Sequence, residues 1–229
     1  MLPLTETSRV RRWPVVTYVL LAANLLVFGY ELSLGRQLEP FLDLWGMVPA
    51  SLAGFIEGVE PHPGVLVTPL TSMYLHFGWL HLATNMLYLA VFGGAVEMML
   101  GARRFLFFYT VCGLLAAAAL IIAAPGSNIP AIGASGAIAG ILGAYLVLKP
   151  GTTVAALAPV LFLVPALDLP AVLMLGLWFL SQFLSGWVGV TGSSSAAAEV
   201  AWAAHVGGLL AGFFLVWFFR PPRRPLYHW

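Results

Sequence analysis

Charged residues are scarce in this 229-residue sequence. Lysine and arginine together number 10 and aspartate and glutamate 9, so that 8% of the chain is charged and 61% is hydrophobic, with a mean hydropathy of +0.95. A soluble domain carries charge on about a quarter of its residues. The composition therefore excludes an ordinary soluble domain and predicts a polytopic membrane protein, and a net charge of +1 gives no reason to expect nucleic acid as a partner.

Residues for disulfide and metal chemistry are also few. The single cysteine, Cys112, cannot form an intramolecular disulfide. The chain has no H-E-x-x-H motif for zinc, and its two aspartates, Asp43 and Asp168, lie outside the long apolar runs or at the edge of one. Neither a metal site nor a cofactor is expected, and zinc-dependent and aspartate-dependent hydrolysis are disfavoured.

Long apolar runs fill most of the chain. A bilayer core needs about 20 apolar residues per helix. This length predicts spans near residues 13–32, 79–100, 105–124, 134–149, 170–188 and 198–219. Segment 152–167 is also apolar, but it is short and contains two prolines, so we interpret it as interfacial or loosely packed rather than as a seventh span. We therefore expect an all-α polytopic membrane protein, with one membrane domain over residues 1–229 and six transmembrane helices.

The distribution of basic residues supports six spans. With both termini in the cytoplasm, nine of the ten cations lie on the inner side and only Arg36 lies outside, as the positive-inside rule requires. A seventh span would carry Arg220 and its basic neighbours to the other face. The large first loop, about 33–72, then faces outward, and its apolar pieces are expected to lie in the membrane interface.

Polar side chains occur inside three of the predicted spans. His81 and Asn85 lie four residues apart on one face of the second span, with His76 just before it; Ser135 begins the fourth span, and His205 lies in the sixth. Polar groups at membrane depth are costly, so each one suggests a function. Because these three spans run in the same direction, their polar residues are expected to share one depth in the outer half of the membrane.

Small residues allow the fourth and sixth spans to approach each other closely. Glycine and alanine lie beside Ser135 on one helix and on the same stripe as His205 on the other, at the spacing of one helical face. The two stripes comprise Gly136, Ala139 and Gly143 in the fourth span and Gly208 and Gly212 in the sixth. This packing would bring Ser135 within hydrogen-bonding reach of His205.

Together these groups indicate nucleophilic catalysis. A serine hydroxyl attacks well only when a neighbouring base takes its proton, and neutral imidazole is the usual base. His81, Asn85 and the backbone N–H of Ser135 are candidate donors to an oxyanion, each worth about 3 kcal/mol. Taken singly, the same features have structural interpretations as packing glycines and hydrogen-bonding polar residues. Their conjunction favours a serine–histidine dyad.

At this point the sequence resembles the rhomboid family of intramembrane serine proteases, in its bacterial six-span form. The resemblance covers about residues 40–220, and three stretches carry it: LTSMYLHFGWLHLATNMLYLAVFGGAVEMMLGARRFLFFY, GASGAIAGILGAY and AHVGGLLAGF. The motifs H-x-x-x-N, G-x-S-G and A-H-x-G-G in this order are highly specific to that family.

The resemblance implies a role for each of these residues. Ser135 would be the nucleophile, His205 the general base, and His81 and Asn85 the oxyanion site. Glu97 would be a structural hydrogen-bonding residue at the inner end of span two. Apart from the resemblance, we also expect structural support from His76, Gly133, Gly136, Gly208 and Gly212. The implied substrates are single-span membrane proteins, which would reach the site between spans two and five. The compact six-span form favours the bacterial inner membrane as the location. The basic residues predict that both termini are cytoplasmic, and the polar residues predict an active site open to the outer face.

Two positions depart from the family pattern. Ala139 stands where family members commonly carry an aromatic residue that stacks on the histidine, so the sequence leaves open whether an aromatic from elsewhere covers His205. The stretch LVTPLT replaces a tryptophan–arginine pair of the first loop. Neither change removes a group from the proposed dyad.

Two other functions are weighed against the protease. A catalytically silent relative that binds membrane helices would be expected to lack the serine or the histidine, and both are present. A transporter or channel would be expected to place charge near the membrane midplane. Glu97 is the only carboxylate that we place within a predicted span, and it lies near the cytoplasmic edge. The natural substrate and the oligomeric state are not indicated by the sequence.

Overall fold

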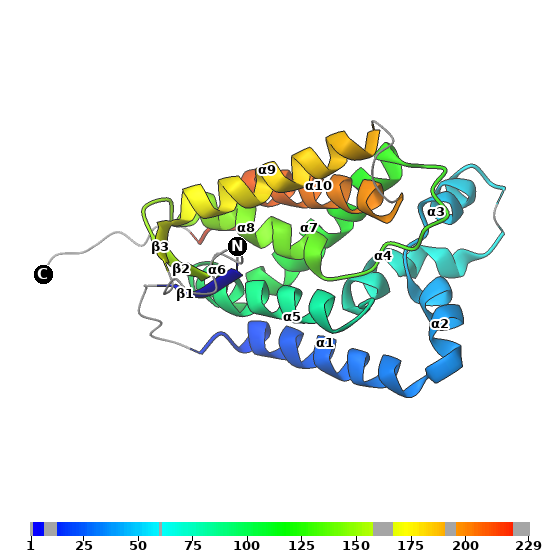
Figure 1. The fold of residues 1–229 in the computed structure, drawn as a ribbon, viewed down its shortest axis with the longest axis horizontal. Coiled ribbons are helices and arrows are strands. Elements are labelled where there is room, and N and C mark those ends of the chain that lie inside the picture. Colours follow the sequence, from blue (N-terminus) through cyan, green and yellow to red (C-terminus); the bar gives the residue numbers. More distant parts are fainter. Residues whose placement is uncertain (1, 7–12, 60, 158–166, 191–195, 222–229) are drawn as a thin grey trace, which may run out of the picture.

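The computed structural model describes residues 2–6, 13–59, 61–157, 167–190 and 196–221. Long apolar helices run along its longest axis, with α8 surrounded by the others, and a group of short helices closes one end (Figure 1). The long helical segments are α1 (Val15–Ser33), α5 (Trp79–Tyr88) continuing through η4 (Leu89–Gly93) into α6 (Gly94–Leu100), α7 (Ala102–Ala123), α8 (Ser135–Leu148), α9 (Ala171–Val190) and α10 (Ala196–Phe219).

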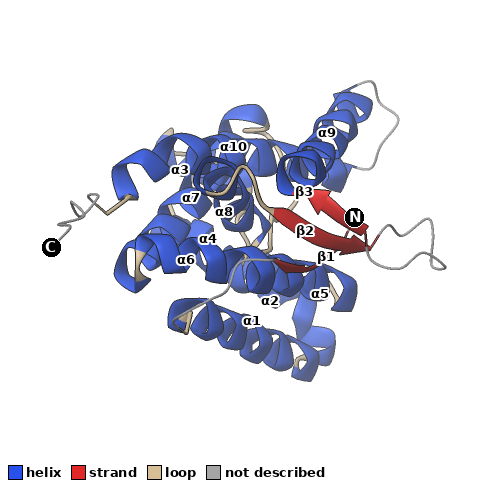
Figure 2. Cartoon of the chain, turned by 90° about the vertical axis from the view of Figure 1, so that its left-hand side faces the viewer, coloured by secondary structure: helices blue, strands red, loops and turns tan. Residues whose placement is uncertain are grey.

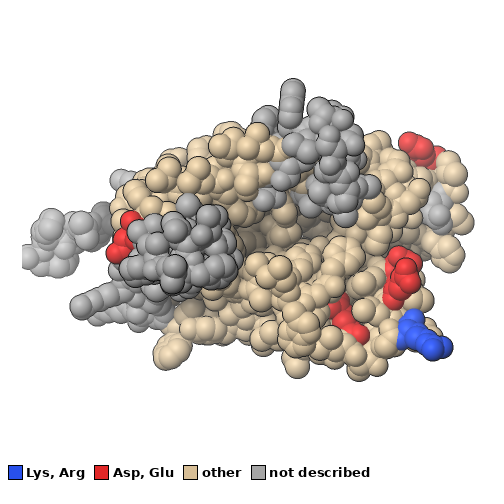
Figure 3. All heavy atoms as spheres, viewed as in Figure 1, with Lys and Arg blue, Asp and Glu red and all other residues tan. Residues whose placement is uncertain are grey.

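These segments begin and end within three residues of the six predicted spans. Four of the described segments are long and apolar enough to cross a membrane, namely Val15–Ser33, Trp79–Leu100, Ala102–Ala123 and Trp202–Phe219. α8 and the first part of α9, Ala171–Ser181, are shorter apolar helical segments. The face in Figure 3 shows its few charged side chains toward the two ends of the molecule. The chain is a polytopic helical bundle, as predicted.

The first loop folds into short helices at one end of the bundle. They are η1 (Gly35–Gln37), α2 (Leu38–Trp45), α3 (Pro49–Ile56), η2 (Pro63–Val67), α4 (Thr68–Thr71) and η3 (Ser72–Tyr74). Met47 and Ala131 exchange backbone hydrogen bonds of 3.1 and 2.8 Å, which join this loop to the segment before α8. The first loop therefore braces the turn that leads into Ser135.

A small antiparallel sheet, which the sequence analysis did not predict, lies at the opposite end of the bundle (Figure 1), and Figure 2 shows its strands in red. Its strands, in spatial order, are β1 (Leu2–Glu6), β2 (Thr153–Leu157) and β3 (Leu167–Pro170). β2 occupies the first part of the segment 152–167 that we interpreted as interfacial or loosely packed, so that part is an ordered strand. Residues 158–166 lie outside the described residues.

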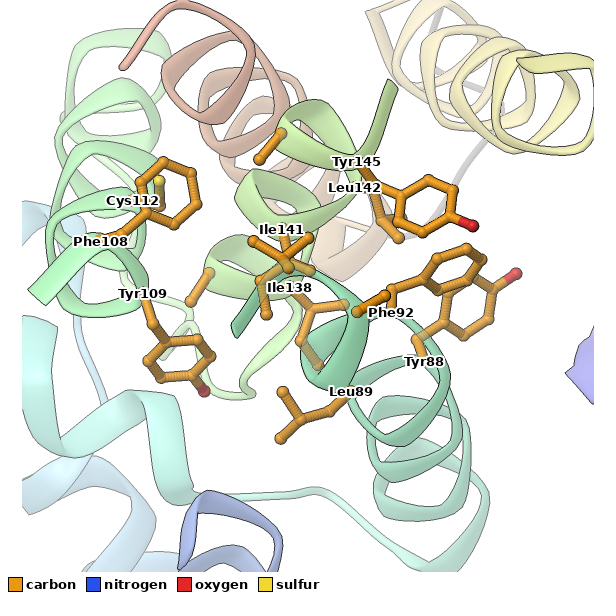
Figure 4. Close-up of a cluster of buried hydrophobic side chains, with 14 of the residues drawn as sticks. Tyr88, Leu89, Phe92, Phe108, Tyr109, Cys112, Ile138, Ile141, Leu142 and Tyr145 are labelled. Atoms are coloured by element: carbon orange, nitrogen blue, oxygen red, sulfur yellow. The ribbon is translucent and has the colours of Figure 1, made fainter. Parts of the chain in front are cut away.

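Large apolar side chains pack around α8 (Figure 4). Ile141, Leu142 and Tyr145 of this helix are fully buried, and the Tyr145 ring meets the Phe92 ring edge to face with centroids 4.9 Å apart. Cys112 is buried in the same cluster. In a bilayer the outward-facing side chains meet lipid, so this interior cluster is held mainly by close packing.

Glycines set the approach of α8 and α10. A Cβ atom on Gly208 would collide with the carbonyl oxygen of Gly136, and one on Gly212 with the carbonyl oxygen of Gly140. The two backbones thus touch along the seam that the small-residue stripes predicted. Gly140, which we had not placed in a stripe, contributes as well.

Glu97 lies far along the second predicted span, in α6, and is buried. Its carboxylate accepts the backbone N–H groups of Val16 (3.0 Å) and Thr17 (2.7 Å) and the Thr17 hydroxyl (2.8 Å). The first turn of a helix leaves its N–H groups without helical partners, and α1 has no side-chain cap of its own. Glu97 supplies that cap from a different helix.

Candidate active site

Ser135 is the first residue of α8, directly after a tight turn. Gly133 in that turn has a φ of +122°, a conformation that side chains disfavour, and its N–H donates a 2.8 Å hydrogen bond to the carbonyl oxygen of Ser72. This hydrogen bond ties the turn to the first loop. The serine is therefore held from both sides, by the helix that follows it and by the loop that precedes it.

His205 of α10 faces Ser135. Its Nε2 atom lies 2.8 Å from the Ser135 Oγ atom, which is a hydrogen bond between residues 70 positions apart. The glycine seam described above permits this contact, because it lets α8 and α10 approach without intervening side chains. With neutral imidazole protonated at Nδ1, the hydroxyl donates to Nε2, which is the arrangement that general-base catalysis requires.

His81 and Asn85 of α5 lie at the same place. Together with Ser135 and His205 they line a cavity of about 150 Å³. Asn85 is buried and donates an amide N–H to the His81 carbonyl oxygen at 3.0 Å. A Cβ atom on Gly133 would lie 2.7 Å from Nε2 of His81 and 3.7 Å from Nδ2 of Asn85. The absence of a side chain at Gly133 thus leaves room for both polar groups beside the serine.

The start of α8 adds backbone donors. In an α-helix the N–H groups of the first turn have no helical acceptor, and the partial positive charge of the helix dipole gathers there. No side chain caps α8. When Ser135 Oγ bonds to a carbonyl carbon, the oxyanion that forms on that carbon would therefore meet both these donors and the polar groups of α5.

His76 lies behind His81. It is buried, and its ring meets the His81 ring edge on, with centroids 5.1 Å apart. Burial, together with the nearby charge of His81 when protonated, lowers the pKa of His76 to about 4. A neutral His76 therefore packs against the ring that faces the serine, and it supports that ring rather than lining the cavity.

The sequence analysis missed a buried carboxylate near the site. Glu31, in the last turns of α1, is 1% exposed and accepts the backbone N–H of His76 at 3.1 Å. It lies inside the predicted span 13–32, and Glu199 lies inside the predicted span 198–219, so the statement that Glu97 is the only carboxylate within a span was wrong. A carboxylate inside a predicted span is the signal that could have identified Glu31, but the residue lies at the edge of the apolar run and was overlooked. Glu31 anchors the segment that leads to His81.

A second missed residue is Trp178 of α9. Its ring centroid lies 5.7 Å from that of His205, at an interplanar angle of 47°. Trp178 also lines the cavity that holds Ser135. No sequence signal identified it, because residues 171–180 around it carry no polar side chain that would show which side of α9 faces the bundle.

A second cavity, of about 170 Å³, adjoins Ser135 and His205 on the side of the first loop. Its lining is largely apolar and includes Met73, Ala116 and Leu120. Among the residues that the structure describes, no group of three or more His, Cys, Asp or Glu side chains is placed to hold a metal ion. Of the sequence-predicted residues, Ser135, His205, His81 and Asn85 meet at the site, whereas Glu97 lies at the other end of α5–α6.

Fold and site together define a class: an integral membrane protein of packed helices that holds a serine–histidine pair inside the bundle. The Rhomboid domain matches residues 63–222, which is more than half of the chain. The chain belongs to the rhomboid family.

Two curated relatives from Bacillus subtilis (strain 168) carry the family name. Rhomboid protease GluP is 30% identical over 202 residues, which is 88% of this chain and 34% of that protein. Putative rhomboid protease YdcA is 31% identical over 137 residues, which is 60% of this chain and 63% of that protein. This chain thus spans about a third of the length of the former, and the match covers less than two thirds of the latter.

Proposed function

We propose that this protein is an intramembrane serine endopeptidase that uses Ser135 as nucleophile and His205 as general base. The observation that carries the proposal is the 2.8 Å contact between Ser135 Oγ and His205 Nε2. The names of the two relatives, both called rhomboid protease, support hydrolysis of peptide bonds. Peptide hydrolysis by such a pair needs no metal or cofactor.

The proposed reaction has two halves. Ser135 Oγ attacks the carbonyl carbon of the substrate while His205 takes the hydroxyl proton, and the amine leaves with that proton to give an acyl-enzyme. Water then attacks the ester carbonyl while His205 takes a proton from the water, and the C–Oγ bond breaks as His205 returns that proton to Ser135 Oγ, which releases the carboxylic acid product. In both tetrahedral intermediates the oxyanion would be stabilised by Asn85, His81 and the backbone N–H of Ser135.

The cavity that holds the pair suggests the class of substrate. Besides the four polar residues, its lining includes Thr84 and Tyr88 of α5 and Trp178 of α9. These helices are parts of predicted spans two and five, so an extended segment arriving between them would meet Ser135 directly. The proposed substrates are single-span membrane proteins that are cleaved in or near their membrane segment.

The proposed orientation follows from the described basic residues. Arg103 and Arg104 lie in the first turn of α7, Lys149 directly follows α8 and Arg220 directly follows α10. The Arg220 guanidinium donates to the Val147 carbonyl oxygen at 3.1 Å. All four belong to the end of the bundle that carries the small sheet, whereas Arg36 lies in the first loop. By the positive-inside rule the sheet end is cytoplasmic and the loop end faces outward.

A cleavage assay tests the proposed function. The substrate is a reporter whose single membrane segment contains small and helix-breaking residues, reconstituted with the protein in vesicles. Ser135→Ala is expected to abolish cleavage, and His205→Ala to slow it by more than about a hundredfold. Asn85→Ala is expected to reduce turnover without abolishing it. Cleavage by Ser135→Ala at the wild-type rate would exclude the assignment.

The alternative is a silent relative that binds membrane helices without cutting them. Both groups of the proposed dyad are present and within hydrogen-bonding distance, which favours the protease. Binding of the reporter without cleavage, by a folded wild-type protein, would favour the alternative.

A further inference from the structure

Ala139 lies one turn after Ser135 on the side of α8 that packs against α10. It is fully buried, and its Cβ atom is 3.3 Å from the place that a Cβ atom on Gly208 would take. Gly208 itself touches the Gly136 carbonyl oxygen. An aromatic side chain at position 139 would therefore need α8 and α10 to separate, and a close-packed seam resists that. This bundle leaves no room for a ring on α8 beside His205.

A ring from another helix lies beside His205 instead. Besides its contact with the imidazole, the indole of Trp178 lies 6.3 Å from the Tyr88 ring of α5. Tyr88 is buried and stacks on Phe92, with centroids 5.9 Å apart. The Trp178 ring thus has one side against a packed aromatic group and another against the proposed catalytic base.

We propose that Trp178 is a positioning residue that holds the His205 imidazole toward Ser135, in place of the aromatic side chain that position 139 cannot accommodate. This inference rests on the proposed function. The hydrogen bond to Ser135 holds one ring nitrogen of His205, and rotation about the His205 χ angles breaks that contact. An adjacent aromatic ring limits that motion, and such contacts are worth about two- to tenfold in the population of the ordered arrangement.

The position of Trp178 has a consequence for substrate binding. The same side chain lines the cavity between α5 and α9, so a bound substrate would contact the ring that orients the base. Loss of Trp178 would then affect both the binding of a membrane segment and the reactivity of Ser135. A small serine-reactive probe separates the two effects, because it does not need the helix-binding surface.

The test measures how fast a fluorophosphonate probe labels Ser135 in the purified protein. Trp178→Leu is expected to slow labelling by about three- to tenfold, while Trp178→Phe, which keeps an aromatic ring, stays within about twofold of wild type. Phe179→Leu is the matched control, since it removes an aromatic side chain from the next position of the same helix, and it should leave the rate unchanged. Thermal unfolding checks that each variant is folded; if Trp178→Leu is not, Trp178→Met replaces it.

Different outcomes separate the two proposals. If the probe does not label the wild-type protein, or if it labels Ser135→Ala as fast as wild type, the proposed function is overturned. Labelling of wild type that depends on Ser135 but proceeds equally fast in Trp178→Leu would overturn only the role of Trp178. The role of Trp178 would also be overturned if labelling slowed as much in Trp178→Phe or in Phe179→Leu as in Trp178→Leu, because the effect would then not depend on an aromatic ring at position 178.

Discussion

Gly133 shows how a residue without a side chain shapes this site. It combines a positive φ with close contact to His81 and proximity to Asn85. Gly101 offers a comparison, because it also has a positive φ, of +84°, but nothing within 4 Å of its would-be Cβ atom. The pair separates the cost of backbone strain from the cost of filling the space beside the serine.

We predict that Gly133→Ala slows probe labelling of Ser135 by more than about tenfold, because the new methyl group displaces the His81 ring and a small misplacement at a reacting centre is costly. Gly101→Ala should suffer only backbone strain, about 1–3 kcal/mol of unfolding free energy, and keep the wild-type labelling rate. Labelling rates and thermal unfolding of both variants check this. Equal rates in the two variants would contradict the account of the site.

His76 makes stability depend on pH. Its pKa in the folded protein is about 4, below the ordinary value of 6.5, so the unfolded chain binds a proton that the folded chain does not. The contribution of a neutral His76 is complete above pH 6.5 and is lost as the pH falls toward 4. The loss amounts to about 3 kcal/mol over that interval.

The measurement is the free energy of unfolding in mixed micelles between pH 7 and pH 4. The difference between wild type and His76→Gln should shrink as the pH falls, because the variant has no imidazole to protonate at this position. A difference that stays constant across the interval would show that His76 is not buried in its neutral form.

At the scale of the elements, the seam between α8 and α10 brings the dyad together. We predict that Gly212→Ala destabilises the protein by about 1–3 kcal/mol, since the methyl group collides with the Gly140 carbonyl oxygen. Gly29→Ala in α1 is the control: its side chain would point into open space, and it should be neutral or stabilising by up to about 1 kcal/mol. Unfolding titrations of the two variants and of wild type measure these free energies. Equal stability of Gly212→Ala and Gly29→Ala would contradict the close packing of α8 against α10.

The helices could be predicted because hydropathy along the chain follows the thickness of a bilayer. Ser135 and His205 could be paired because each is a polar residue on a glycine-lined face. The sheet could not be predicted, since β1 and β2 are about 150 residues apart and carry no motif. The role of Trp178 could not be predicted either, because the uniformly apolar stretch around it gives no sign of which side of the helix faces the bundle. Glu31 was within reach of the reasoning and was overlooked.

At the scale of the whole molecule, the proposed topology has the first loop outside the membrane and the sheet end inside the cell. The single native cysteine, Cys112, is buried, so Cys112→Ala provides a background without thiols. In that background, Arg36→Cys is expected to react with a membrane-impermeant maleimide on intact cells, and Gly151→Cys only after the cells are opened. The opposite pattern would invert the proposed topology.

The central claim is that His205 activates Ser135. The most direct measurement is mass-spectrometric location of a fluorophosphonate label on the purified protein and on its His205→Ala variant. The account predicts a label on Ser135 in wild type and a loss of at least about a hundredfold in labelling rate in the folded variant. A label on another residue, or a Ser135 label that forms equally fast without the histidine, would contradict it.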